Sequence, residues 1–179
     1  QRVIAAKPAA HGTPPLNGRY VVRRLLARGG MGSVYEVDDM VLPGTIRAVK
    51  EMDLATVEQA ERQDAVADFR REATLLRTLS HPNLVKVLDH FSVSGKEYLV
   101  MEYVQGETLE SYLRNRPRTE AQVLPLALQL CDVLDYLHNR TPPIIYRDLK
   151  PSNAMVEAKT GLVKLIDFGI ARFYKPGKQ

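Results

Sequence analysis

The first part of the chain carries short runs of Val, Leu, Ile and Tyr, as strands do. Residues 20–26 and 33–37 form two such runs on either side of a glycine-rich break, which predicts a hairpin with a glycine-rich tip. Ser94-Gly95 predicts a turn between two later runs. The pattern therefore predicts five strands, the remaining three being 46–50, 84–91 and 97–104.

Other segments have the 3.6-residue spacing of helices. Apolar residues at Phe69, Ala73, Leu76 and Leu79 predict a helix over residues 64–79. A short helix is expected at 108–115. Thr119-Glu120-Ala121-Gln122 has the form of a capping box and opens a long apolar helix that ends near Asn139. Its apolar side chains on one side are Leu124, Leu128, Cys131, Leu134 and Leu137.

Composition narrows the classes of protein that fit. The chain has 179 residues, 45% of them hydrophobic, which suffices for a sizeable core. Its net charge of +4, with no basic run interleaved with aromatic residues, is too weak to indicate nucleic-acid binding. No apolar run approaches the ~18 residues of a membrane span, so no membrane segment is expected in this stretch. The proline-containing residues 1–17 have the composition of a linker.

The single cysteine, Cys131, excludes an internal disulfide and a cysteine-based zinc site. Its helical neighbours Leu128 and Leu134 predict a thiol in the core, and we expect a reducing, cytoplasmic setting. The four histidines have no spacing that fits a pair of metal ligands, so each is interpreted as structural.

The stretch from Asp148 to Asn153 concentrates the candidate chemistry. It places a carboxylate, the ammonium of Lys150 and a carboxamide within six residues, and Asp167 follows the apolar run 162–166. Phosphoryl transfer needs cations, metal ions and a positioned hydroxyl more than covalent help. Asp148 can accept the proton of an attacking hydroxyl and Lys150 can steady the transferring phosphate, while Asn153 and Asp167 offer oxygen ligands suited to Mg²⁺.

These residues resemble the catalytic loop of Hanks-type protein kinases, H-R-D-L-x-x-x-N, which is followed by D-F-G. The chain matches at Arg147-Asp148-Leu149, at Asn153 and at Asp167-Phe168-Gly169. Tyr146 stands where the family more often has a mainly structural His. Lys150, two residues after the loop Asp, is similar to the serine/threonine branch of the family.

The family's other motifs occur in the same order along the chain. The flap pattern G-x-G-x-x-G-x-V falls on Ala27, Gly29, Gly32 and Val34, and the segment 28–32 resembles bacterial kinases. The strand ending at Lys50 resembles V-A-I-K, and Glu72 in the following helix is expected to pair with it. The segment from Met101 to Val104 resembles the hinge. The resemblance thus implies that nucleotide is bound by Ala27, Gly29, Gly30, Gly32, Val34, Ala48, Lys50, Met101, Glu102, Val104 and Met155.

The resemblance implies an α+β, protein-kinase-like fold with a five-stranded antiparallel small lobe, one main helix and the first part of a helical large lobe. We expect a linker at 1–17, the small lobe at 18–101, and the hinge and partial large lobe at 102–179. The implied reaction transfers the γ-phosphoryl group of ATP to a protein Ser or Thr hydroxyl. Asp148, Lys150, Lys50 and Glu72 would be catalytic, and Asn153 and Asp167 would hold Mg²⁺. An apolar stack that aligns the lobes would comprise Leu76, Val87, Tyr146 and Phe168.

Two other functions stay open. One is a pseudokinase that binds nucleotide or acts as a scaffold, although the presence of Lys50, Asp148, Asn153 and Asp167 argues against it. The other is a small-molecule kinase of the same fold. The chain ends ten residues after Gly169, so we also expect a segment of a longer protein, cut within the activation segment. Residues 1–179 alone are expected to bind ATP weakly, to lack protein kinase activity and to self-associate.

Overall fold

The computed structural model of the chain describes residues 14–29, 32–52, 60, 62–114, 117–167 and 172–173, with the backbone alone at Glu72, Arg172 and Phe173. Most of the predicted linker, the flap residue Gly30 and the pair Phe168-Gly169 lie outside these residues. The chain divides into two compact units, one formed by residues 1–79 and 86–103 and the other by 80–85 and 104–179. The assignment of residues 18–101 and 102–179 to two lobes stays a prediction.

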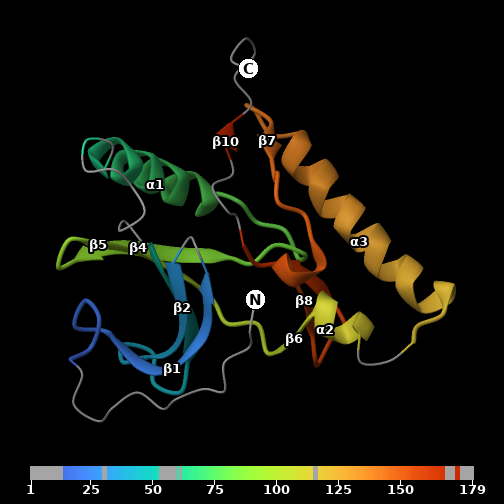
Figure 1. The fold of residues 1–179 in the computed structure, drawn as a ribbon, viewed down its shortest axis with the longest axis horizontal. Coiled ribbons are helices and arrows are strands. Elements are labelled where there is room, and N and C mark those ends of the chain that lie inside the picture. Colours follow the sequence, from blue (N-terminus) through green and yellow to red (C-terminus); the bar gives the residue numbers. More distant parts are fainter. Residues whose placement is uncertain are drawn as a thin grey trace. The chain divides into compact units, whose positions relative to one another are not determined.

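The first unit is built on an antiparallel five-stranded sheet with one helix (Figure 1). Helix α1 (Arg62–Leu76) packs against β4 and β5. The five strands and the helix that the sequence predicts are all present. In spatial order the strands are β1 (Tyr20–Gly29), β2 (Gly32–Asp39), β3 (Ile46–Met52), β5 (Lys96–Glu102) and β4 (Val87–Val93).

Aromatic rings and valines form the core on one face of this sheet. The ring of Phe91 stacks between Tyr20 and Tyr98, at centroid distances of 5.7 and 5.1 Å. Val37 and Val49 are fully buried beside them. Because successive side chains of a strand point to opposite faces, the neighbours Glu36 and Ala48 lie on the other face of the sheet. That second face carries the predicted nucleotide site.

Asp39 ends β2 with a buried carboxylate. Its side chain is 0% exposed, and Arg19 donates Nε and Nη2 to its two oxygens at 2.8 and 2.7 Å. The N–H of Val41 donates to Oδ1 at 3.1 Å. The hydrogen bonds from Arg19 lower the pKa of Asp39 despite the opposing effect of burial. The ionised carboxylate therefore joins the start of β1 to the end of β2.

The replacement Asp39→Asn should lower the free energy of unfolding at neutral pH by about 2 kcal/mol, because the hydrogen bonds from Arg19 lose their charged acceptor. The pKa of Asp39 is lower in the folded chain than in the unfolded one. Its stabilising contribution is therefore fully present above the unfolded pKa of about 3.9 and is lost as the pH falls toward the folded pKa. Urea unfolding of both proteins at neutral and acidic pH checks this. If the difference in free energy of unfolding between the wild-type protein and Asp39→Asn were as large at acidic pH as at neutral pH, this prediction would be wrong.

Among its described residues, the second unit contains a short helix, a long helix and two small sheets (Figure 1). A three-stranded sheet has the order β6-β8-β9, and β10 pairs with β7. Gly106 allows β6 to approach β8, because a Cβ there would collide with the carbonyl oxygen of Val156. The elements are β6 (Gly106–Thr108), α2 (Leu109–Arg114), α3 (Glu120–His138), β7 (Ile144–Ile145), the 3₁₀ turn η1 (Pro151–Asn153), β8 (Ala154–Glu157), β9 (Val163–Leu165) and β10 (Arg172–Phe173).

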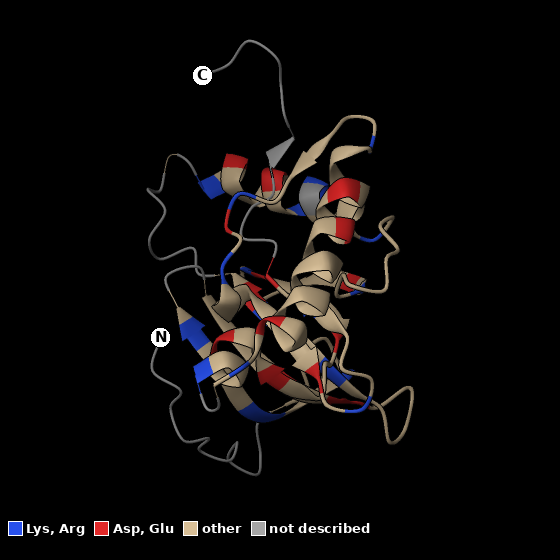
Figure 2. Ribbon diagram, turned by 90° about the vertical axis from the view of Figure 1, so that its right-hand side faces the viewer, with Lys and Arg blue, Asp and Glu red and all other residues tan. Residues whose placement is uncertain are grey.

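Helix α3 begins as its sequence predicts. The N–H of Thr119 donates to Oε1 of Gln122 at 3.1 Å, one half of the predicted capping box. Among the described residues, no helix is long and apolar enough to cross a membrane. Acidic and basic residues are interspersed through the elements of both units (Figure 2).

The buried face of α3 differs from the prediction. Leu126, Val133 and Leu137 are the buried residues of the helix. Cys131 is exposed, so the prediction of a core thiol is wrong. Leu128, 60% exposed, lies on the same side as Cys131. At 3.6 residues per turn this side is opposite to Leu126 and Val133, and both sides are apolar, so hydrophobicity alone could not decide which one is buried.

Candidate functional site

Strand register gathers four of the predicted nucleotide-binding residues on one face of the first unit's sheet. Val34 of β2 lies directly opposite Lys50 of β3, and Ala48 lies directly opposite Met101 of β5. Directly opposed residues share a face, and the two rows are neighbours because Ala48 and Lys50 are two positions apart. Ala48 and Met101 are buried, whereas Val34 and Lys50 are half-buried. Val34, Ala48 and Met101 therefore form an apolar surface, and the ammonium group of Lys50 lies beside it.

The glycine-rich segment lies between the end of β1 and the start of β2. Gly29 pairs with Gly32, and Ala27, the residue at the family's first glycine position, pairs with Val34. Gly32 has φ of 128°, a conformation that a residue with a Cβ rarely adopts. Ala27 follows a register irregularity between Leu25 and Ala27, but its φ is not positive, so its methyl group causes no backbone strain there. The predicted contact of Gly30 with nucleotide lies outside the described residues.

The predicted hinge begins at the end of β5. The N–H of Glu102 donates to the carbonyl of Lys86 at 2.9 Å, which ties the end of β5 to the residue before β4. Val104, two residues on, is buried in the second unit. Met155 is half-buried in β8 of that unit, opposite Thr108 of β6. For Glu72, the partner expected for Lys50, only its place in α1 is described.

Lys150 and Asn153 of the candidate catalytic loop both contact Asp148. Oδ2 of Asp148 accepts hydrogen bonds from Nζ of Lys150 at 2.6 Å and from Nδ2 of Asn153 at 2.8 Å. Nδ2 of Asn153 also donates to the backbone oxygen of Asp148 at 3.0 Å. The Lys150 hydrogen bond, more than that of Asn153, holds the pKa of Asp148 below its usual range. Asp148 is therefore an ionised carboxylate at neutral pH.

The backbone conformation orients the side chains of Asp148 and Asn153. Arg147 has φ of 46°, and the N–H of Asp148 bonds to the carbonyl of Tyr146 at 2.5 Å, which makes a tight, strained turn just before the carboxylate. The 3₁₀ turn η1 starts at Pro151, and the N–H of Asn153 donates to the Lys150 carbonyl at 2.9 Å. The turn brings Asn153 back beside Asp148.

Asp167 is placed near Asn153 by the strand that precedes it. The N–H of Ile166 donates to the carbonyl of Asn153 at 3.0 Å. Tyr146, 3% exposed, donates its hydroxyl to the same carbonyl at 3.4 Å. Burial, and next the Asp167 charge, raise the pKa of Tyr146, so its hydroxyl stays protonated. The residue that replaces the family's His is thus a buried donor between the loop and Asp167.

The oxygen atoms of Asp167 and Asn153 suit a hard metal ion that also binds water or phosphate. The described residues hold no cluster of three His, Cys, Asp or Glu side chains that could enclose a metal ion. Asn153 directs its amide nitrogen to Asp148, which leaves its Oδ1 as the atom that can face a cation. One carboxylate and one amide oxygen suit Mg²⁺, which commonly retains waters and binds substrate phosphates.

Asn83 supports this region and was not predicted. Its Nδ2 donates to the Val163 carbonyl at 2.7 Å and to Oε1 of Gln129 at 2.8 Å, and its carbonyl accepts the N–H of Leu165 at 2.9 Å. Asn83 is buried and so fixes β9, which leads to Asp167, against α3. In the sequence, Asn83 lies between the predicted helix 64–79 and the predicted strand 84–91. A polar residue held in an apolar setting gives no signal until its partners are known.

Comparison with known proteins agrees with this arrangement. The family model described as "Protein kinase domain" matches residues 20–179. The chain belongs to the protein kinase domain family. This confirms the resemblance to Hanks-type kinases and, with it, the predicted protein-kinase-like α+β fold.

Similar proteins include bacterial kinases. The chain is 36% identical to "Probable serine/threonine-protein kinase PknB" of Lactococcus lactis subsp. lactis, over 86% of this chain and 24% of that protein. It is 40% identical to "Serine/threonine-protein kinase pkn2" of Myxococcus xanthus, over 90% of this chain and 19% of that protein. The chain therefore spans a quarter or less of these relatives. A solved structure, "Rad53 1-466 in complex with AMP-PNP", has the same fold, with a TM-score of 0.74 at 24% identity over 86% of this chain and 39% of that one.

Proposed function

We propose that this protein kinase segment belongs to an ATP-dependent serine/threonine kinase that transfers the γ-phosphoryl group to protein hydroxyls. The observation that carries the proposal is the contact of Asp148 with both Lys150 and Asn153, at 2.6 and 2.8 Å. A carboxylate kept ionised beside an ammonium is the arrangement needed to receive a hydroxyl proton next to a transferring phosphate. The relatives named as serine/threonine kinases support the choice of substrate hydroxyl.

The residues of each unit have separate tasks in this proposal. Val34 and Ala48 enclose the adenine, Met101 is the gatekeeper residue at the end of β5, and the backbone of the glycine-rich hairpin approaches the phosphates. Lys50, oriented by Glu72, binds the α- and β-phosphates. Asp148 takes the proton of the substrate hydroxyl, and Lys150 compensates the charge of the moving phosphoryl group. Because the transfer is in line, these residues contribute position and charge and form no covalent bond.

Mg²⁺ would be held by Asn153 and Asp167 and would neutralise charge on the phosphate oxygens. Both offer hard oxygen atoms, so ATP binding should strengthen when Mg²⁺ or Mn²⁺ is added and should not respond in this way to Zn²⁺. Asp167→Asn should remove most of the gain, because the carboxylate supplies the charge. Calorimetric titration of ATP with and without each metal measures this. Equal ATP affinity with and without Mg²⁺ would refute the metal assignment.

The proposed function itself is tested by phosphate transfer from γ-labelled ATP. The natural full-length protein should label protein Ser or Thr residues, identified by phosphoamino-acid analysis. Binding of ATP without any transfer would favour the pseudokinase alternative. Transfer to small molecules but to no protein would favour the small-molecule kinase.

A further inference from the structure

Glu36 is a buried carboxylate on the face of the sheet that carries the nucleotide site. It lies directly opposite Ala48, which lies directly opposite Met101. Its side chain is 9% exposed. A carboxylate is costly to bury beside an apolar surface unless its charge is paired. The partners of Glu36 therefore indicate why an acid is placed at this point.

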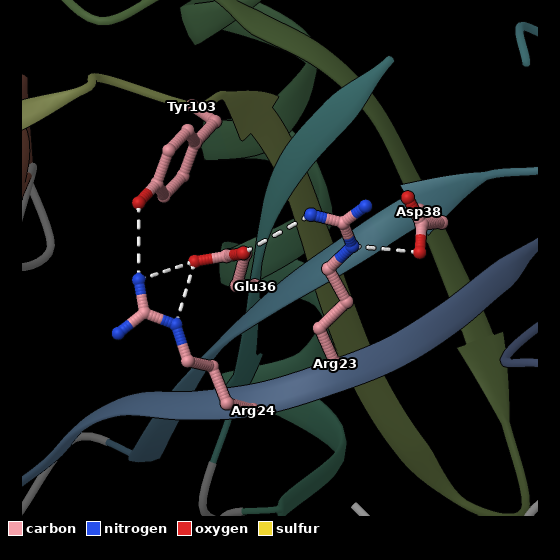
Figure 3. Close-up of polar contacts among 5 residues, drawn as sticks. All are labelled: Arg23, Arg24, Glu36, Asp38 and Tyr103. Carbon is pink, nitrogen blue, oxygen red and sulfur yellow. Dashed lines mark hydrogen bonds and ion pairs between the residues drawn. The ribbon is translucent and has the colours of Figure 1, made fainter. Parts of the chain in front are cut away.

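Two arginines of β1 pair with Glu36 (Figure 3). Arg24 approaches Oε2 with Nε at 2.8 Å and Nη2 at 2.6 Å. Arg23 approaches Oε1 more loosely, with Nη1 at 3.5 Å, and makes its shorter contact with Asp38, from Nε to Oδ2 at 2.7 Å. Arg24 is therefore the principal partner of Glu36, and Arg23 belongs mainly to a surface pair.

Arg24 also reaches the segment that follows β5. Its Nη2 donates to the hydroxyl of Tyr103 at 3.3 Å (Figure 3). Tyr103 comes two residues after Met101, in the predicted hinge. Burial and the nearby Glu36 carboxylate raise the pKa of Tyr103, while Arg24 opposes the rise, so the hydroxyl stays protonated at neutral pH. One guanidinium thus joins β1, β2 and the predicted hinge.

A simpler role for these residues is to stabilise the hairpin. Exposed ion pairs such as Arg23 with Asp38 contribute about 0–1 kcal/mol and need no further function. Arg24 and Glu36 differ from that pair in two ways. Glu36 is buried in the same cross-strand row as two predicted nucleotide-binding residues, and Arg24 bonds to the hinge segment as well as to Glu36. A pair that only closed the hairpin would require neither feature.

We propose that Arg24, Glu36 and Tyr103 form a positioning network that holds the segment Met101–Tyr103 against β1 and β2 and thereby increases the affinity for ATP. The inference rests on the proposed nucleotide site. The network itself does not contact the reacting phosphate, so it should affect nucleotide binding and leave the transfer step unchanged. Because Arg24 is shared, loss of Tyr103's hydroxyl and loss of Arg24 should act through the same connection.

The test measures ATP affinity in Tyr103→Phe, Arg24→Met and the double variant. Each single variant should bind ATP about three- to tenfold more weakly, as expected for loss of one or two hydrogen bonds. The double variant should be little worse than Arg24→Met, because both changes break one connection. In the full-length enzyme, KM for ATP should rise in parallel while kcat stays near the wild-type value.

Asp38→Asn is the matched control, because it breaks the Arg23 pair on the same strands without touching Tyr103. It should leave the ATP affinity unchanged. Tyr103→Phe keeps the ring and its volume, so it decides the question even if Arg24→Met does not fold. Unchanged ATP affinity in Tyr103→Phe, or an equal loss in Asp38→Asn, would overturn the inference alone. Failure of the wild-type protein to bind ATP would overturn the proposed function and the inference with it.

Discussion

In the full-length protein, Asp148→Asn should reduce phosphoryl transfer about a thousandfold, within the range of about 10²–10⁴ that general base catalysis supplies. The change removes the charge and the basicity but keeps the size of the side chain. It also keeps an oxygen that can accept the hydrogen bond from Asn153. The melting temperature should stay nearly unchanged, because Asp148 and Lys150 are partly exposed and Asn153 keeps a hydrogen-bond acceptor. Rate assays and thermal unfolding of the same preparation check both expectations.

Asp135→Asn is the control for this variant, since it makes the same chemical change at an exposed position of α3. It should leave the rate unchanged. The lowered pKa of Asp148 adds a pH prediction: the carboxylate is ionised well into the acid range, so the wild-type rate should show no loss from this group near neutral pH. Wild-type rates in Asp148→Asn would remove Asp148 from the mechanism.

Most of the first unit could be predicted because its strands are long and its turns are marked by glycine. Strands of seven to ten residues carry enough Val, Ile and Tyr for the pattern to be read, and the turn at Ser94-Gly95 has positive φ at both residues. The strands β6, β8 and β9 were not predicted. With three or four residues each, they are too short to show a period, and they form only because the chain brings them together.

The sequence predicted the residues of the catalytic loop and those of the sheet to different degrees. Asp148, Lys150 and Asn153 are close in sequence, so a single turn suffices to bring them into contact. The shared face of Val34, Ala48, Lys50 and Met101 depends on which strands are neighbours, and motif order predicted those residues without showing their register. Polar residues held by distant partners, such as Asn83 and Glu36, gave no signal at all. Their partners lie up to 80 residues away in the chain.

In the full-length protein, Lys50→Met should abolish most phosphoryl transfer. The loss should be at least about a hundredfold, the cost of removing one charged or hydrogen-bonding group that stabilises a transition state. Lys50 lies in β3 between Val34 and Leu99, on the face that carries the predicted nucleotide-binding residues. Methionine keeps the length of the side chain and removes only the ammonium that we assign to the phosphates. Folding should be retained, because the side chain is half-buried at the side of the apolar surface.

The same sheet supplies the control. Lys96→Met removes a lysine of β5 that pairs with Glu51 at 2.8 Å, away from the proposed phosphates, and should leave the rate near the wild-type value. Glu72→Gln should weaken transfer in the same direction as Lys50→Met, and the double variant should be no worse than Lys50→Met, because the glutamate is proposed to act only through the lysine. Equal losses in Lys96→Met and Lys50→Met would mean that the rate follows the net charge of the sheet. Additive losses in the double variant would mean that Glu72 acts on its own and does not orient Lys50.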